Sequence, residues 1–99
     1  MAIVEVTIAP MGTPGTSVSR YVANCHKVLA EAADVKYELN PMGTVIEGDL
    51  DRILAVIRKM HEVPFGEGAQ RVSTLIRIDD RRDKVSTMAA KLQAVKEKL

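Results

Sequence analysis

The order in which hydrophobic periodicity changes along the chain limits the possible folds more than any other feature. Four segments alternate apolar and polar residues as strands do, at residues 2–9, 35–40, 44–47 and 71–79. Three other segments place apolar residues three or four positions apart, as helices do, at about residues 17–33, 50–63 and 85–99. The sequence therefore predicts the order βαββαβ, followed by one extra helix.

This order is that of two βαβ-like halves joined by a hairpin. It predicts an α+β fold of the ferredoxin-like type, a sandwich in which both helices cover one face of a four-stranded antiparallel sheet. The chain has 99 residues, and either half alone would be too small to bury an adequate core. We therefore expect a single domain over residues 1–99.

Prolines, glycines and capping residues set the expected boundaries. Two prolines and two glycines between Pro10 and Gly15 predict a loop there, because such a segment continues neither a sheet ladder nor a helix. Asp49 is expected to cap the second helix, which Pro64 and Gly66 should end, and Asp83 is expected to cap the last one. The apolar stripe of that last helix looks about as strong as those of the core helices, but the sheet needs only two helices on one face, so we expect this helix to bind the domain's own edge or a neighbour.

The predicted sheet keeps one face free of helices. Polar residues solvate part of this face, namely Glu5, Thr7, Glu47, Ser73 and Arg77, but Ile3, Val45 and Leu75 would remain at the surface. Because large apolar patches are uncommon on monomers, we expect a second subunit to cover the face.

Composition argues against several partners. A net charge of +1, with both signs interspersed, provides no field that would attract nucleic acid, and the last predicted strand lacks the aromatic residues that RNA-binding sheets use. No apolar run is long enough to span a membrane, and the N-terminus does not resemble a signal peptide. With a single cysteine, Cys25, the chain is expected to be cytoplasmic.

The tetrapeptide Pro-Met-Gly-Thr occurs twice, at residues 10–13 and 41–44. The second copy follows Asn40, and the order Asn-Pro-Met-Gly is what a type I turn prefers. Taken alone, the repeat fits two turns of similar chemistry as well as it fits a binding site.

Three longer segments carry a resemblance to a known family. They are Val-Glu-Val-Thr-Ile-Ala-Pro-Met-Gly-Thr-Pro-Gly-Thr-Ser at residues 4–17, Tyr-Glu-Leu-Asn-Pro-Met-Gly-Thr-Val-Ile-Glu-Gly at 37–48 and Arg-Val-Ser-Thr-Leu-Ile-Arg-Ile-Asp-Asp-Arg-Arg at 71–82. In these segments the chain resembles the small thiamine-binding proteins, of the superfamily that binds thiamine and hydroxymethylpyrimidine. The resemblance implies a ferredoxin-like fold, homo-oligomers and non-catalytic binding of a thiamine-like ligand, with no other cofactor.

The resemblance also implies a region for the ligand, at the end of the first strand and around the hairpin. The residues concerned are Thr7, Ile8, Pro10, Met11, Gly12, Asn40, Thr44, Val45 and Glu47. An aminopyrimidine needs paired donors and acceptors, and a thiazolium cation favours a carboxylate or an aromatic face. Candidates for the cation are Glu38, Glu47, Tyr37 and Tyr21, although strand carboxylates are usually solvated and helical tyrosines usually belong to the core.

We expect no catalytic residues and no metal site. Cys25 and His26 are neighbours on a helix, so their side chains diverge by about 100° and do not form a nucleophile and base or a metal pair. Cys25 is expected to be buried, and His61 to stabilise the end of the second helix as a cation. The predicted function is a carrier, sensor or regulator, and the alternatives are an oligomeric regulatory module or an enzyme acting on a small metabolite.

Overall fold

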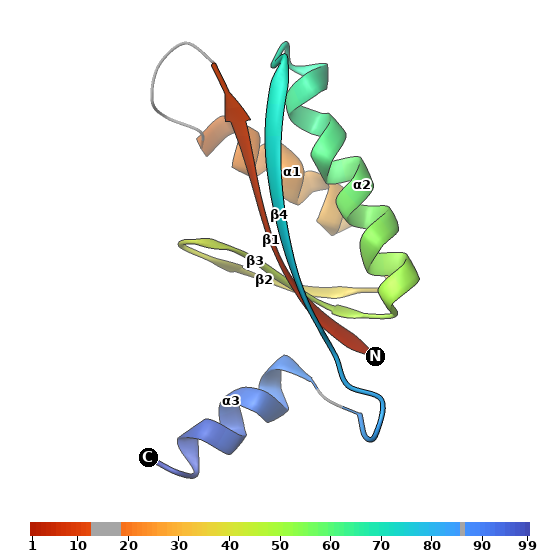
Figure 1. The fold of residues 1–99 in the computed structure, drawn as a ribbon, viewed down its shortest axis with the longest axis vertical. Helices are drawn as coiled ribbons and strands as arrows, with labels where there is room; N and C mark the ends of the chain where they lie inside the picture. Colours follow the sequence, from red (N-terminus) through yellow and green to blue (C-terminus); the bar gives the residue numbers. More distant parts are fainter. Residues whose placement is uncertain (13–18, 86) are drawn as a thin grey trace.

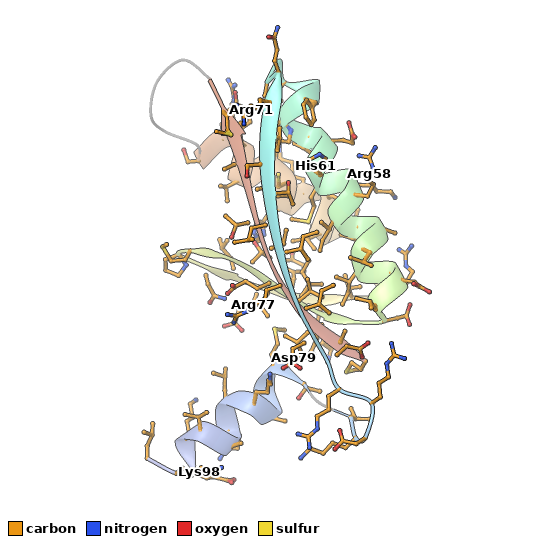
Figure 2. All side chains as sticks on the ribbon, viewed as in Figure 1. Arg58, His61, Arg71, Arg77, Asp79 and Lys98 are labelled. Atoms are coloured by element: carbon orange, nitrogen blue, oxygen red, sulfur yellow. The ribbon has the colours of Figure 1, made fainter. Side chains whose placement is uncertain are left out.

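The computed structural model describes residues 1–12, 19–85 and 87–99 and follows the predicted order (Figure 1). The elements are β1 (Ala2–Met11), α1 (Ser19–Glu31), β2 (Lys36–Asn40), β3 (Gly43–Gly48), α2 (Leu50–Gly66), β4 (Arg71–Asp80) and α3 (Met88–Lys96). The strands form one antiparallel sheet in the order β2-β3-β1-β4. This topology confirms the ferredoxin-like α+β prediction.

The core lies between one face of this sheet and the two helices α1 and α2. Alternate residues of β1, Ala2, Val4 and Val6, are buried on this face, and Val4 pairs with the fully buried Ile46 of β3. The helices contribute one stripe each, with Cys25 and Leu29 from α1 and Ile53, Val56, Ile57 and Met60 from α2. The alternation of β1 thus directs its apolar residues to the helices, as the period of two predicts.

The first strand is longer than expected, and the prediction of a loop beginning at Pro10 is wrong. Pro10 pairs with Val72 and Met11 with Arg71, so β4 extends the ladder of β1. On its other side, the pairing of β1 with β3 ends at Val6 and Thr44. A proline is tolerated in a strand that lacks a partner on one side, because no N–H is required there. The remainder of the expected loop, and the expected start of α1 at about residue 17, lie outside the described residues.

The second helix begins where expected and ends at Gly66, one of the two residues expected to stop it, but it passes through the other, Pro64. The Asp49 carboxylate accepts the Arg52 N–H at 3.3 Å, which confirms the N-cap. Pro64 lies inside α2 and is buried, and the helix continues to Gly66. Proline removes one helical hydrogen bond, but here it fills part of the core beside the end of the helix.

The third helix differs most from expectation. Thr87 caps it by accepting the Ala90 N–H at 3.0 Å, whereas Asp83 instead pairs with Arg81. No residue of α3 is buried, and Figure 1 shows the helix apart from α1 and α2, below the hairpin of β2 and β3. The expected apolar stripe therefore does not join the core.

The face of the sheet away from α1 and α2 is called the open face below. Glu5 and Arg77 are exposed on it and pair across β1 and β4, and Leu75 is 71% exposed. The expectation that Glu47 is solvated is wrong: Glu47 is buried, and its carboxylate accepts the Met88 N–H at 2.7 Å. This bond places a negative charge at the N-terminus of α3, where the helix dipole favours it.

Among the helices that the structure describes, none is long and apolar enough to cross a membrane.

Candidate functional site

A cavity of about 300 Å³ lies between α1, the middle of β1 and the β2–β3 hairpin, on the helix-covered side of the sheet. Its lining comes from all of these elements and from one residue of α2. The lining residues are Val6, Thr7, Ile8, Ala9, Val22, Cys25, His26, Leu39, Asn40, Pro41, Met42, Gly43, Thr44 and Met60.

Unequal strand lengths create this space. The β1–β3 ladder stops at Val6 and Thr44, while β1 continues along β4 to Met11. The hairpin turn fills only part of the gap, and the Thr7 hydroxyl donates to the Met42 carbonyl at 3.2 Å. A Cβ added at Gly43 would lie 2.9 Å from Thr7 Oγ1 and 3.1 Å from the Val6 carbonyl oxygen. This close approach of turn and strand therefore requires glycine at position 43.

A histidine and a threonine in the cavity wall form a polar pair. His26 Nε2 of α1 lies 3.0 Å from Thr44 Oγ1 of β3, and the His26 ring meets the Tyr37 ring edge-on at 5.7 Å between centroids. Burial lowers the pKa of His26 from its usual value of 6.5. The imidazole is therefore neutral at neutral pH, with one nitrogen as a donor and the other as an acceptor.

Cys25 also lines the cavity, next to His26. Its thiol donates to the Met60 carbonyl at 3.5 Å and is buried, which confirms the expected structural cysteine. Burial, with a smaller contribution from the charge of Glu67, raises the pKa of Cys25 to about 11. The thiol remains protonated at neutral pH and is a poor nucleophile.

The predicted ligand residues fall into three groups. Thr7, Ile8, Asn40 and Thr44 line the cavity. Pro10 is buried within β1, and Met11 and Gly12 line a separate depression with residues of α1 and of the turn between α2 and β4.

Val45 and Glu47 form the third group, on the open face. Val45 pairs with Glu5 and Glu47 with Ile3, whereas Thr44 lies with Val6 on the helix-covered face. Glu47 is occupied by the N-terminus of α3. These two residues are therefore separated from the cavity by the sheet itself.

The two copies of Pro-Met-Gly-Thr also have different positions. All four residues of the second copy, 41–44, line the cavity. Of the first copy, Pro10 and Met11 continue β1, Gly12 has a positive φ of 71°, and Thr13 lies outside the described residues. Only the second copy marks this cavity among the residues described.

Sequence reasoning missed several lining residues. His26, Val22 and Leu39 were not among the predicted contacts, although Val22 and His26 share one helix face at a spacing of four. That spacing was the available signal for α1. None of the residues considered for a thiazolium cation, Tyr21, Tyr37, Glu38 and Glu47, belongs to the lining.

Outside the cavity, His61 does not have the expected role. It lies inside α2 rather than at its end, and His61 Nδ1 lies 2.6 Å from Thr74 Oγ1 of β4. The described part of the chain contains no cluster of three or more His, Cys, Asp or Glu residues that could hold a metal ion.

Comparison with known proteins agrees with this architecture. A sequence model described as "Thiamine-binding protein" matches residues 4–96. A UPF0045 protein of Bacillus subtilis strain 168 is 50% identical over 100% of this chain and 98% of its own length. The crystal structure of a hypothetical protein from Methanocaldococcus jannaschii superposes with a TM-score of 0.86 at 42% identity, covering 97% of this chain and 96% of that one.

A more distant crystal structure shows the same fold. It is that of a candidate thiamine biosynthesis/salvage protein from Thermotoga maritima, with a TM-score of 0.77 at 17% identity, covering 95% of this chain and 97% of that one. The match of the family model over nearly the whole length, and the close relatives that span it, show that this chain belongs to the thiamine-binding protein family.

Proposed function

We propose that the protein binds thiamine or a related aminopyrimidine such as hydroxymethylpyrimidine in the cavity beside His26 and Thr44, as a carrier, sensor or regulator. The cavity itself carries the proposal. Its volume of about 300 Å³ is at the lower end of the range for small-molecule sites, and its walls are mostly apolar with few polar groups. The family to which the chain belongs is named for binding this class of ligand.

The lining suits a flat nitrogen heterocycle. Ile8 and Val6 from β1 and Val22 and Met60 from the helices provide apolar walls for the faces of a ring. His26 and Thr44 provide adjacent polar groups that now bond to each other. A ring edge with a donor beside an acceptor replaces this bond with two new ones, so neither group loses a partner when the ligand enters.

We propose binding without turnover. The Cys25 thiol is protonated and already bonded to the Met60 carbonyl, so the cavity does not offer it as an activated nucleophile. The name of the Thermotoga maritima protein supports a role in thiamine biosynthesis or salvage, since its fold is the same. Release of product from thiamine phosphates in a turnover screen would contradict the proposal and favour an enzyme.

The direct test is calorimetry with thiamine and with hydroxymethylpyrimidine. We expect saturable binding by the wild-type protein, and Thr44→Val should weaken it by about fivefold to tenfold, as the loss of one hydrogen bond would. The matched control is Thr74→Val, which removes the other histidine–threonine pair, His61 and Thr74, outside the cavity. Absence of heat up to high micromolar ligand, or equal loss in both variants, would contradict the assignment.

We also propose that the protein is a cytoplasmic homo-oligomer, a dimer or tetramer formed through the open face. The exposure of Leu75 and of the apolar residues of α3, Leu92 and Val95, supports this. The mass in solution, measured by light scattering with and without thiamine, tests it. A stable oligomer whose melting temperature no tested ligand changes would favour a regulatory module instead.

A further inference from the structure

The lining of the cavity carries no formal charge. None of the described lining residues is Lys, Arg, Asp or Glu, and the only titratable groups among them are the Cys25 thiol and the His26 imidazole. Residues 13–18, Thr-Pro-Gly-Thr-Ser-Val, precede α1 and contain no charged residue either. Whatever their position, they add no charged side chain to the site.

The charged residues next to lining residues in the chain, Glu5, Lys27, Glu38 and Lys59, are exposed and outside the lining. Glu5 lies on the open face opposite Arg77, and Glu47 on that face accepts the N–H of Met88. Glu67 bonds with Asn24 of α1, and its charge contributes to the raised pKa of Cys25. The charge of Glu67 thus opposes a further negative charge at Cys25.

Among the described residues, the lining also lacks the backbone alternative for binding an anion. Helix N-termini bind phosphate through the free N–H groups of their first residues. The cavity meets α1 at Val22, Cys25 and His26, whereas the helix begins at Ser19. Of the residues described, those that line the cavity therefore come after the first residues of the helix.

We propose that this cavity selects by charge, accepting an unphosphorylated heterocycle and rejecting the phosphate esters of the same molecule. This inference rests on the proposed function and narrows it. A phosphate that enters the cavity loses its hydration and finds no cationic side chain among the described lining residues to replace it, while the charge of Glu67 opposes it. The protein then binds the unphosphorylated form of the molecule, which is the substrate of a kinase or the product of a phosphatase.

Calorimetry with three probes at one pH and ionic strength tests this selection. The probes are hydroxymethylpyrimidine, thiamine and thiamine diphosphate. We expect the diphosphate to bind at least about tenfold more weakly than thiamine, as an uncompensated buried charge requires. Equal or tighter binding of the diphosphate would overturn the charge selection and leave the proposed function standing, whereas absence of binding by all three would overturn both.

A designed cation at the cavity sharpens the test. Leu39 lines the cavity and is 58% exposed, so Leu39→Lys adds a positive charge there without burying it. This variant should bind thiamine diphosphate more tightly than the wild type does. The difference between its affinities for thiamine and for thiamine diphosphate should therefore be smaller. The control Ala30→Lys adds the same charge at an exposed position of α1 outside the lining. A similar gain in both variants would show general attraction and contradict selection by the cavity, and circular dichroism verifies that both are folded.

Discussion

The two faces of the sheet differ in how they are stabilised. On the helix-covered face, Val4 and Ile46 are completely buried, and α1 and α2 pack over them with many apolar side chains. On the open face, α3 has no buried residue and is held by the Glu47 bond to Met88 and by an ion pair between Lys91 and Asp79. Most of the hydrophobic free energy of folding therefore comes from one face, while the other depends on a few polar contacts.

The same contrast separates neighbouring residues of a single strand, β3. Ile46 belongs to the core, and Val45 and Glu47 on either side of it belong to the open face. Because side chains alternate, one short strand serves a packed core and a lightly held helix at once. Stability of the fold and attachment of α3 should therefore respond to different substitutions.

The largest effect should come from Ile46→Ala. Loss of a fully buried side chain leaves a cavity, and we expect the free energy of unfolding to fall by about 2–5 kcal/mol. Val45→Ala, one position along on the open face, is the matched control and should lower it much less. Chemical denaturation measures both, and similar losses would show that the two faces contribute equally.

A smaller and more local effect is expected for Glu47→Ala. Without the carboxylate, the Met88 N–H loses its acceptor and α3 loses a favourable charge at its N-terminus, which together amount to about 1–2 kcal/mol. Hydrogen exchange should become faster across Met88–Lys96 while α1 and α2 keep their protection. Glu47→Gln retains an acceptor and should exchange more slowly than Glu47→Ala; uniform loss of protection in the whole chain would contradict a local attachment.

The smallest effect concerns pH. His26 has a lowered pKa in the folded protein, so the unfolded chain takes up its proton first as the pH falls. The contribution of neutral His26 to the free energy of unfolding is therefore fully present above the unfolded pKa of 6.5. It is lost as the pH falls below that value toward the lowered folded pKa. Denaturation at a series of pH values measures this.

His26→Gln serves as the control for that measurement, because glutamine does not titrate. The wild-type free energy of unfolding should decline as the pH falls below the usual histidine pKa, and this decline should be smaller in the variant. Added salt should leave the His26 decline in place but weaken the exposed pair of Lys91 and Asp79 on the open face. An unchanged pH profile in His26→Gln would mean that another group titrates.

Much of the fold was predictable because it depends on local pattern. The period of two in β1 identified its buried side, and Asp49 identified the start of α2. Pro10 was misassigned because its place in a strand depends on the length of β4, far along the chain. The surface that α3 contacts was left open between the domain's own edge and a neighbour, since an apolar stripe does not reveal which surface lies beneath it.

The site was predictable only in part. Thr7, Ile8, Asn40 and Thr44, which the family resemblance places near the ligand, line the candidate cavity, but His26 meets Thr44 only because folding joins residues 18 apart in sequence. Val45 and Glu47 lie at odd separations from Thr44, so the period of two already places their side chains on the opposite face of β3.

The two histidine–threonine pairs have a mechanical consequence. His26 joins α1 to β3 through Thr44, and His61 joins α2 to β4 through Thr74. A hydrogen bond is directional, whereas apolar contacts are not, so each histidine–threonine pair restrains the sliding of its helix along the sheet. A ligand that bonds to both His26 and Thr44 would replace the direct link between α1 and β3 by a link through itself, and would leave the link between α2 and β4 unchanged. The position of α1 relative to the sheet would then depend on the size of the ligand, whereas that of α2 would not.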